Sequence, residues 1–560
     1  MKFESYFVSC LEKVQCRPDF EPEIPLPQTP GVIAVHHVAQ GENYACQLML
    51  KSDINMHLVF SADAPEGVEI TFREVGLVPC DMPALPGDDD VLFPHAGLHP
   101  DPLLPIEKPM RLTFNNWHAV YIDFKVSADC KPGRYAIPFT IESVYTPGCP
   151  WGIPFDIVKK EKVILNVHKA ELQPQKLICT NWFHCDCLAY YYGVEIWSDE
   201  FWSIAADFWR DMTAHGRNML YTPLWTPPLD TAVGAERPTC QLLKITYKNG
   251  RYSFDFSLLE KFIALAQACG VEYFEMSHIF TQWGAKATPK IVAETENGME
   301  KIFGWHVESS SAKYEEFLSA LLPELAKFFE AHKLAGKVYF HLSDEPPLAS
   351  IGTYRKGAEI VYRYLSRKDY PVLDALSNID FFHQDLLDVP VPAVNEFHLF
   401  DREKTRERWF YYAGMSNGYT TSSYGVASRR NRIIGVLCYL YRIEGFLHWG
   451  HNFWFGQYSL HYDLDPWRET TADRAFTGGG SFNVYPGKDR KPVDSLHYEI
   501  FTLALNDLRL LRTLEAKIGR EETVKLVHAG LDYEITMNRY PRDAAYLENL
   551  HTAVLKKLDE

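Results

Sequence analysis

The sequence lacks long apolar runs, and this absence excludes a membrane-spanning protein. No stretch approaches the roughly 20 consecutive apolar residues that cross a bilayer as a helix. The first residues also lack the apolar core and cleavage pattern of a secretory leader. No basic amphipathic segment is present that would attach the chain to a membrane surface. We therefore expect a cytoplasmic protein without a membrane partner.

Closely paired cysteines are absent as well. The 12 cysteines are scattered, and none are spaced as Cys-x-x-Cys, which indicates reduced thiols rather than a disulfide framework. The nearest approach to a metal motif, His184-Cys185-Asp186-Cys187, has no second pair of ligands. Gly478-Gly479-Gly480 does not match the glycine pattern of dinucleotide-binding loops. We expect neither a metal nor a cofactor.

Basic residues are outnumbered: 56 Lys and Arg face 73 Asp and Glu, a net charge of −17. Such a surface repels phosphate backbones, so we expect no nucleic-acid partner.

The 46% hydrophobic and 23% charged residues are typical of a globular protein, and 560 residues predict two or three domains. Aromatic residues make up 14%, which fits either sugar-binding platforms or a large aromatic core. Composition alone favours the core.

Residues 1–171 have the pattern of an antiparallel β-sandwich. Short runs rich in β-branched and aromatic residues alternate with turns containing Pro, Gly and Asp. The clearest predicted strands are Gly31–Val38, Tyr44–Leu50, Val68–Val75, Ala119–Val126 and Lys162–Val167.

Residues 172–500 alternate strand-like runs with amphipathic helices, which predicts a (β/α)8 barrel of the TIM type. Expected helices include one opened by the capping box Ser257–Glu260, one over about 314–335 and one over about 429–444. Residues 501–560 are predicted to form a helical segment that packs on the barrel. Eight strands are expected to begin near Leu177, Asn218, Val271, Lys337, Pro371, Val391, Arg408 and Gly445.

Two inserts follow the second and third predicted strands. Asn249-Gly250 is a hairpin turn, and Asn297-Gly298 is a second probable turn. Barrel enzymes place their sites at the carboxyl ends of the strands, and we expect both inserts on that face.

The fourth predicted strand, Lys337–Glu345, has a period of two. Val338, Phe340 and Leu342 are expected to face the helices, whereas His341 and Glu345 share the opposite, inward face. Pro346 and Pro347 end the strand, and a bend there would bring Asp344 to the rim beside Glu345. Two adjacent acids can have different roles: one donates a proton, and the other stays ionised and stabilises developing positive charge. We predict Glu345 and Asp344 as the catalytic pair.

Further polar and aromatic residues gather at the ends of the other predicted strands. Glu275 is either the partner of a basic residue in the barrel, which we favour, or a second catalytic carboxylate. The remaining clusters favour the lining of a sugar pocket over core packing. The predicted substrate-binding residues are Trp182, His184, Glu275, His278, His341, Tyr412, His448, Trp449, Asn452, Trp454 and Tyr485.

At these residues the sequence resembles the catalytic domain of glycoside hydrolase family 123. The resemblance rests on His341–Pro347, Trp409–Tyr412, Arg432–Trp454 and Gly479–Gly487, within roughly residues 175 to 515. It implies a β-N-acetylgalactosaminidase-like enzyme that retains anomeric configuration by substrate assistance. In that mechanism Glu345 would be the acid/base, Asp344 would hold the 2-acetamido group, and that group would form an oxazoline.

We therefore expect a retaining exo-β-N-acetylhexosaminidase that acts on small glycans. One alternative is a glycosidase for sugars without the acetamido group, which would use Glu345 with Glu275. The other is a non-catalytic carbohydrate-binding protein on the same scaffold. The oligomeric state is left open.

Overall fold

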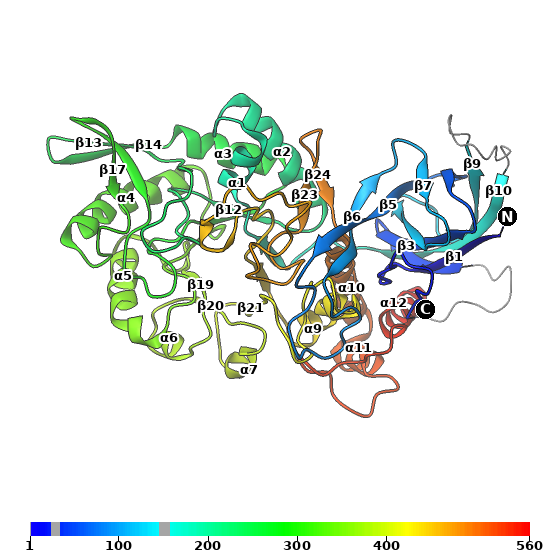
Figure 1. The fold of residues 1–560 in the computed structure, drawn as a ribbon. Helices are drawn as coiled ribbons and strands as arrows, with labels where there is room; N and C mark the ends of the chain where they lie inside the picture. The colour runs from blue at the N-terminus through cyan, green and yellow to red at the C-terminus, as the bar shows by residue number, and fades with distance from the viewer. Residues whose placement is uncertain (1, 24–33, 145–156) are drawn as a thin grey trace. The chain divides into compact units, whose positions relative to one another are not determined.

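The computed structural model describes residues 2–23, 34–144 and 157–560, and the chain divides into two compact units. The first, here called the sandwich unit, comprises 1–176, 416–440 and 493–560. The second, the βα unit, comprises 177–415 and 441–492. Figure 1 shows both along the chain. Contrary to expectation, the C-terminal helices therefore belong with the N-terminal sheets.

The sandwich unit contains two five-stranded sheets, with strand orders β1-β3-β8-β5-β6 and β2-β10-β9-β4-β7. The expected β-sandwich is present, but one ladder departs from the antiparallel pattern, because β10 pairs with β2 in parallel. The predicted strand Gly31–Val38 overlaps β2 from residue 34; its first three residues lie outside the described ranges. The strands are β1 Phe3–Ser9, β2 Ala34–Gln40, β3 Asn43–Ser52, β4 Met56–Ala62, β5 Val68–Cys80, β6 Gly97–Pro105, β7 Met110–Leu112, β8 His118–Val126, β9 Gly133–Ser143 and β10 Ile157–Glu171.

Alternate residues of these strands form one hydrophobic core. Leu48 on β3 and Ile122 on β8 come from the first sheet, and Ile137 on β9 and Val163 on β10 come from the second; all are at most 1% exposed. Alternate side chains of each strand therefore face the space between the two sheets.

Helices from two distant segments complete the sandwich unit. Gly435 has no room for a side chain, since a Cβ there would lie 2.0 Å from the carbonyl oxygen of Ala504. This close approach joins α9 to α10. The expected helix 429–444 is thus two short helices followed by a strand. The helices of the unit are α8 Arg429–Arg432, α9 Ile434–Leu440, α10 Leu496–Ile518, α11 Arg520–Val527 and α12 Tyr546–Asp559.

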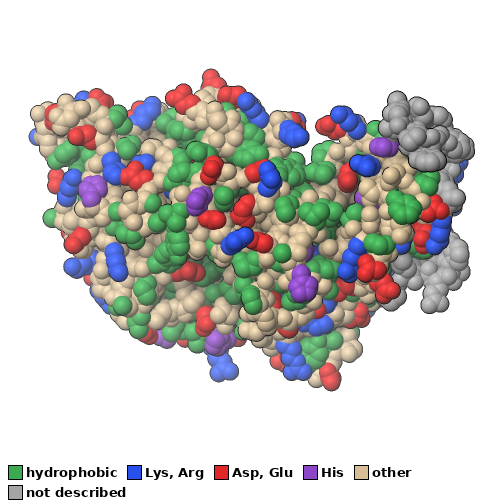
Figure 2. All heavy atoms as spheres, viewed as in Figure 1, with side chains coloured by type: hydrophobic (Ala, Val, Ile, Leu, Met, Phe, Trp, Pro, Cys, Tyr) green, Lys and Arg blue, Asp and Glu red, His purple; other side chains and the backbone are tan. Residues whose placement is uncertain are grey.

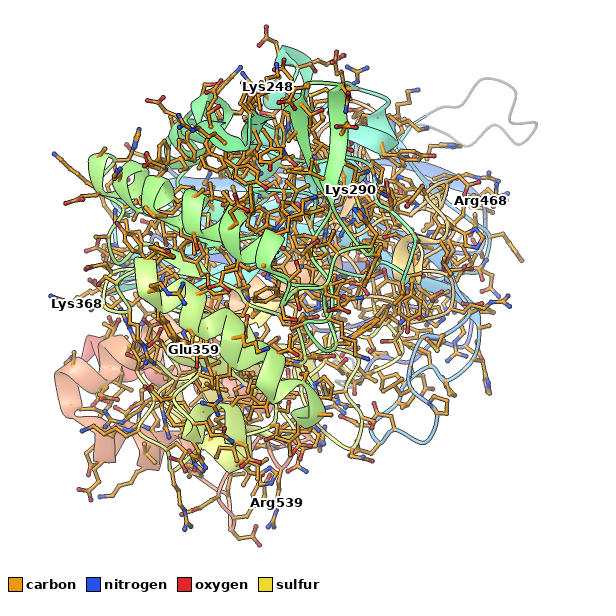
Figure 3. The ribbon with its side chains drawn as sticks, turned by 90° about the vertical axis from the view of Figure 1, so that its left-hand side faces the viewer. Lys248, Lys290, Glu359, Lys368, Arg468 and Arg539 are labelled. Atoms are coloured by element: carbon orange, nitrogen blue, oxygen red, sulfur yellow. The ribbon has the colours of Figure 1, made fainter. Side chains whose placement is uncertain are left out.

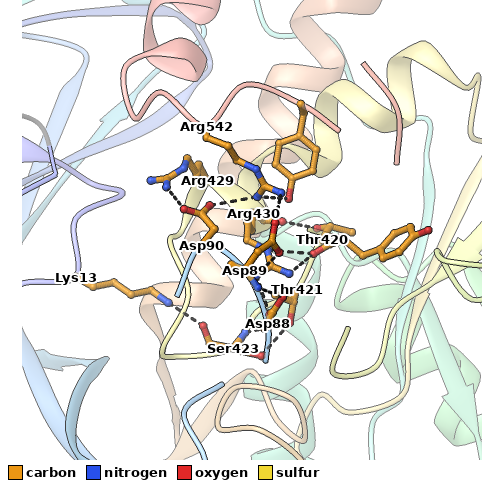
Figure 4. A network of polar contacts seen from close by, with 12 residues as sticks. Lys13, Asp88, Asp89, Asp90, Thr420, Thr421, Ser423, Arg429, Arg430 and Arg542 are labelled. Atoms are coloured by element: carbon orange, nitrogen blue, oxygen red, sulfur yellow. Dashed lines mark hydrogen bonds and ion pairs between the residues drawn. The ribbon is translucent and has the colours of Figure 1, made fainter. Parts of the chain in front are cut away.

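A buried ion-pair network ties the 416–440 segment to the β5–β6 loop (Figure 4). Arg430 is fully buried and places Nη1 2.8 Å from Asp88. Arg429 pairs with Asp90, and Arg542 reaches the same Asp90 at 3.2 Å. Removing one partner of such a buried pair leaves an uncompensated charge, at a typical cost of about 3–5 kcal/mol. The network therefore holds three separate stretches of the sequence in one unit.

The βα unit is built on parallel strands. Six form one sheet in the order β18-β15-β12-β11-β22-β21, and β19 pairs separately with β20. Isolated parallel bridges join Phe340 to Val372 and Ala393 to Tyr411. All eight predicted strands are present; closure into a full (β/α)8 barrel remains a prediction. Their bounds are β11 Ile178–Asn181, β12 Met219–Thr222, β15 Tyr273–Met276, β18 Val338–Phe340, β19 Leu373–Ala375, β20 Val389–Val391, β21 Trp409–Tyr411 and β22 Gly445–His448.

Helices cover the outer side of these strands. Phe340 on β18 contacts Phe329 on α4, with ring centroids 6.1 Å apart, as expected for a residue facing the helix layer. Helices α4 and α5 lie side by side in Figure 3, where Glu359 marks α5. The helices are α1 Cys185–Tyr192, α2 Asp199–Ala214, α3 Ser257–Ala268, α4 Ala312–Ala331, α5 Ile351–Tyr364, α6 Asp380–His383 and α7 Phe397–Phe400, with 3-10 turns η1 Leu348–Ser350 and η2 Gln457–Ser459.

The two inserts form an additional sheet with the order β14-β13-β16-β17. Its first hairpin turns at Asn249-Gly250, as the sequence predicts, and Lys248 marks this tip in Figure 3. Its second hairpin turns at Asn297-Gly298. The bounds are β13 Lys244–Lys248, β14 Arg251–Asp255, β16 Ile291–Thr295 and β17 Gly298–Phe303; two short strands, β23 Val484–Pro486 and β24 Pro492–Asp494, follow later in the chain.

Acidic and basic side chains are interspersed over the face of the molecule in Figure 2. Among the helices of the described ranges, none combines the length and apolar character needed to cross a bilayer.

Candidate active site

The end of β18 presents two neighbouring carboxylates. Leu342 is fully buried, Asp344 is half-buried and Glu345 is exposed, so the chain emerges from the core within three residues. Glu345 has a φ of +43°, a left-handed conformation that is uncommon outside glycine. This residue makes the bend expected before Pro346. The bend lets two consecutive residues both reach the surface at this end of the strand.

Both carboxylate-bearing residues are held by backbone hydrogen bonds from neighbouring segments. The N–H of Glu345 donates to the carbonyl of Ala375 at 2.9 Å, and the N–H of Trp283 donates to the carbonyl of Asp344 at 2.8 Å. The Tyr411 hydroxyl donates to the Glu345 carboxylate. Tyr411 is 7% exposed, and burial together with the charge of Glu345 raises the pKa of its hydroxyl well above 10. Tyr411 therefore remains a donor at neutral pH.

Beneath the turn lies a fully buried group of three ionisable side chains. His341 places Nδ1 2.9 Å from Asp374, and its Nε2 faces Glu275. Glu275 also accepts hydrogen bonds from Thr180 Oγ1 at 2.7 Å and Trp182 Nε1 at 2.8 Å. The two oxygens of Glu275 are thus both engaged with protein groups. This pairing is the one favoured from the sequence, in which Glu275 meets a basic residue inside the fold.

Asp230 is a third carboxylate beside the pair. Its backbone N–H donates to Gln282 Oε1 at 2.7 Å, next to the residue that bonds Asp344. Burial raises the pKa of Asp230 to about 6; Arg237 lowers it in part, and Glu345 raises it. Burial, followed by Glu345 and Asp230, raises the pKa of Asp344. Burial and the neighbouring acids therefore disfavour the simultaneous ionisation of Asp344 and Asp230.

Left-handed backbone conformations are concentrated around this cluster. Asp230, Trp283, Glu345, Tyr458 and Ser459 all have φ between +43° and +58°. Ser459 Oγ donates to the carbonyl of Asp230 at 2.6 Å, and the rings of Trp283 and Tyr458 lie 5.2 Å apart. Such conformations persist where surrounding contacts over-determine them, and they gather at functional sites.

The other residues predicted from the sequence lie mostly below the surface and bond to protein atoms. His184 pairs with the carbonyl of Trp449 at 3.1 Å, and its backbone bonds the amide of Asn452. Trp454 donates to the carbonyl of Val484 at 3.2 Å. Trp449 differs, because its indole nitrogen has no hydrogen-bond partner in the described chain. The exposed fractions are at most 8% for Trp182, His184, Glu275, His278, His341, Tyr412, His448, Trp449, Asn452, Trp454 and Tyr485.

Asp186, within the segment His184–Cys187, forms an ion pair. Asp186 and Arg237 are both buried, and their charged groups lie 2.8 Å apart. Arg237 also donates to the carbonyl of Leu229 at 3.2 Å. The segment thereby anchors the loop that carries Asp230.

Three residues of the site were not identified from the sequence. Tyr411 shares the inward face of β21 with Trp409, whose ring lies 6.2 Å from Tyr339; the period of two could have selected it over Tyr412. Asp374 interrupts an otherwise apolar strand, which is also a readable signal. Asp230 lies in an irregular loop after two prolines and carries no local signal.

The family comparison identifies the class of protein. Residues 182–514 match the family model described as "Glycoside hydrolase 123, catalytic domain". The chain is therefore a glycosidase. It belongs to glycoside hydrolase family 123.

One solved structure supports the fold assignment. A family 123 glycoside hydrolase from Clostridium perfringens, studied for glycolipid glycan hydrolysis, aligns with a TM-score of 0.71 at 13% identity, over 100% of this chain and 97% of that one. A Bifidobacterium dentium β-glucuronidase gives a TM-score of only 0.30 at 9% identity, over 90% of this chain and 66% of that one. No curated protein matched.

Proposed function

We propose that the protein is a retaining exo-β-N-acetylhexosaminidase. Its proposed substrate is a terminal N-acetylgalactosamine, and its proposed mechanism is substrate assistance. The observation that carries the proposal is the adjacent pair Asp344 and Glu345 at the open end of β18, with Glu345 exposed. The eight parallel strands would form the barrel that supports this pair.

In the proposed reaction, Glu345 gives its proton to the glycosidic oxygen as the bond from that oxygen to the anomeric carbon breaks. The carbonyl oxygen of the substrate's 2-acetamido group attacks the anomeric carbon and forms an oxazolinium. Asp344 accepts a hydrogen bond from the acetamido N–H and stabilises the positive charge. Water, deprotonated by Glu345, then opens the ring and restores the acetamido group with retention of configuration.

The crowded carboxylates suit this division of labour. Burial and the neighbouring acids raise the pKa of Asp344 and of Asp230, so ionisation of both groups is disfavoured. In the proposed mechanism, a hydrogen bond from the acetamido N–H would favour the ionised form of Asp344, and Glu345 would carry the proton that the leaving group needs.

The buried position of Glu275 weighs against a two-carboxylate mechanism. Glu275 is 0% exposed, and its oxygens are engaged with Thr180, Trp182 and His341. A nucleophile must reach the anomeric carbon, which this carboxylate could do only after its hydrogen bonds broke.

For the substrate, we propose small glycans, including those released from glycolipids, because the similar Clostridium perfringens enzyme was studied for glycolipid glycan hydrolysis. We also propose a cytoplasmic setting. None of the 11 described cysteines forms a disulfide, which fits a reducing compartment.

The decisive experiment compares aryl β-glycosides that differ only at C2. We expect the wild-type protein to cleave the 2-acetamido glycoside and to leave the 2-hydroxy glycoside almost untouched. Glu345→Gln should reduce turnover of a substrate with a poor leaving group by about 10²–10⁴-fold, the range of general acid catalysis. It should reduce turnover of a nitrophenyl glycoside less, because that leaving group needs little protonation.

Asp344→Asn provides the second arm. It keeps the shape and removes the charge, so kcat should fall much more than KM rises. Equal rates on the two C2 variants, with full activity of Asp344→Asn, would contradict substrate assistance.

A further inference from the structure

A continuous chain of hydrogen bonds crosses the βα unit beneath the turn that carries Asp344 and Glu345. It starts at Thr180 and Trp182 beside β11 and passes through Glu275 on β15 to His341 after β18. It continues to Asp374 on β19 and ends at the hydroxyl of Tyr354 on α5. Each of the three ionisable members is 0% exposed. The mechanism proposed above assigns no task to any of them.

The geometry fixes the protonation state of His341. Its Nδ1 lies 2.9 Å from one carboxylate, and its Nε2 faces the other. Ionised carboxylates only accept hydrogen bonds, so each ring nitrogen must carry a proton for both contacts to be favourable. The ring is then an imidazolium between Glu275 and Asp374. His278 stacks on it with centroids 4.2 Å apart, and burial lowers the pKa of His278 well below 6.5, which leaves that ring neutral.

The same chain reaches the catalytic turn through the backbone. Asp374 accepts hydrogen bonds from the N–H of Leu342 at 3.0 Å and of Ser343 at 3.3 Å, the two residues that precede Asp344. The next residue, Ala375, accepts the N–H of Glu345 at 2.9 Å. Asp374 and Ala375 thus hold the turn on both sides of Asp344.

We propose that His341 is a positioning residue, an imidazolium at neutral pH that holds Asp374 in place and thereby fixes Asp344 and Glu345 in their reactive arrangement. This inference rests on the proposed function, since it assigns the imidazolium to the service of that carboxylate pair. His341 does not touch substrate in this arrangement; it acts through Asp374 and through its charge.

Two physical effects follow from this placement. The first is mechanical: Glu345 keeps an unfavourable φ of +43°, which requires a rigid support on its inner side. The second is electrostatic. Burial, Glu345, Asp230 and Asp374 all raise the pKa of Asp344, while the charge of His341 lowers it. The imidazolium is therefore the cation that opposes three surrounding carboxylates.

A direct test uses the unmodified protein with 15N-labelled histidine. The neighbouring carboxylates overcome the effect of burial and raise the pKa of His341 to about 9. We expect nitrogen resonances of a doubly protonated ring for His341 at pH 7, assigned by their loss in His341→Gln, and a change to the neutral form only near pH 9. A neutral ring at pH 7 would overturn the proposal without the need for any active variant.

Enzymatic variants then separate positioning from mere packing. His341→Gln should lower kcat by roughly 100-fold, the effect of a displacement of about 1 Å, with KM changed by less than about threefold. The acid limb of its kcat/KM profile should move to higher pH, because Asp344 loses its compensating charge. The matched control Tyr354→Phe removes a hydrogen bond to the same Asp374 but no charge; it should lower the melting temperature and leave the acid limb in place.

If His341→Gln melts earlier but keeps the wild-type kcat and acid limb, the histidine is only structural and the inference fails. Should His341→Gln not fold, Asp374→Asn tests the same contact through kcat alone: kcat should fall with KM little changed, and the acid limb is not compared because Asp374 itself raises the pKa of Asp344. The proposed function fails separately: it is contradicted if the wild-type protein cleaves no 2-acetamido glycoside, whatever the state of His341.

Discussion

The hydroxyl of Tyr411 donates a hydrogen bond to the carboxylate of Glu345 and comes from the strand β21, 66 residues further along the chain. It is the one side-chain hydrogen bond to Glu345 within the described ranges. A donor in this place orients the proposed acid toward the glycosidic oxygen and holds it against the bend of the backbone.

We predict that Tyr411→Phe lowers kcat by about 10–100-fold, the scale of a lost hydrogen bond to a charged group of about 1.5–3 kcal/mol. KM should change little, because the bond orients the acid rather than the sugar. Tyr339→Phe is the matched control, a buried tyrosine whose hydroxyl donates to Glu407 instead. Equal losses in the two variants, measured by steady-state kinetics, would remove the special role of Tyr411.

We predict that Asp230→Asn raises the stability of the folded protein and changes its activity. Burial and Glu345 raise the pKa of Asp230 to about 6 in the folded protein, against 3.8 for an unperturbed Asp. Above pH 6 the ionised group therefore opposes folding, and each pKa unit corresponds to about 1.4 kcal/mol before screening by solvent.

The variant should melt at a higher temperature than wild type at pH 7.5. The difference in melting temperature should shrink as the pH falls from about 6 to 4. In this range Asp230 of the folded wild-type protein takes up a proton at a higher pH than it does in the unfolded chain. The kcat/KM of the variant should change as well, because Asp230 raises the pKa of Asp344 and the substitution removes that effect. Glu236→Gln serves as the control on the same loop, since Glu236 pairs with Lys290 and Lys301 instead. A variant that melts as wild type at pH 7.5 would show that Asp230 is not crowded.

Glu275→Gln is predicted to lose stability rather than a nucleophile. It leaves His341 with one buried carboxylate in place of two, and breaking such a pair costs about 3–5 kcal/mol. Chemical denaturation should report that loss. Mass spectrometry of wild type incubated with a 2-fluoro glycoside should find no sugar on Glu275; a covalent adduct there would establish the two-carboxylate alternative.

Two of the three tryptophans predicted to line the sugar pocket, Trp449 and Trp454, should behave differently from each other. Trp449 has an indole nitrogen without a partner in the described chain, whereas Trp454 donates to the carbonyl of Val484. We predict that Trp449→Phe weakens binding of a sugar ligand in calorimetry by about 1–3 kcal/mol. Trp454→Phe should lower the melting temperature and leave the affinity unchanged. The reverse pattern would exchange the roles of the two residues.

Local pattern was sufficient to predict the strands. Each of the eight βα strands begins within two residues of its predicted start, because short β-branched runs between helical segments leave little freedom in register. The pair Asp344–Glu345 was selected from the period of two in Lys337–Glu345 and from the following prolines, but the strand β18 is shorter than predicted and ends at Phe340, before both acids. The missing information was three-dimensional. Nothing in the loop at Asp230 indicates which strand end it approaches.

The unit boundaries were beyond sequence reasoning for a related reason. The apolar stripe Ile433, Val436, Leu437 and Leu440 predicts a buried helical face, but it does not say which core buries that face. The partner is Ala504 on α10, in the sandwich unit, and the contact depends on the missing side chain of Gly435.

The excursion of residues 416–440 into the sandwich unit has a consequence for biosynthesis. Strands β21 and β22 are neighbours in one sheet, yet the stretch of chain between them belongs to the other unit. On the ribosome, the parallel sheet cannot acquire β22 until that excursion has emerged, and the sandwich unit waits longer still for α10 and α12. Neither unit can be excised by cutting one peptide bond. We therefore expect early stop codons to yield degradation-prone fragments, and an attempt to express residues 1–176 alone to give an aggregating β-rich polypeptide rather than an autonomous module.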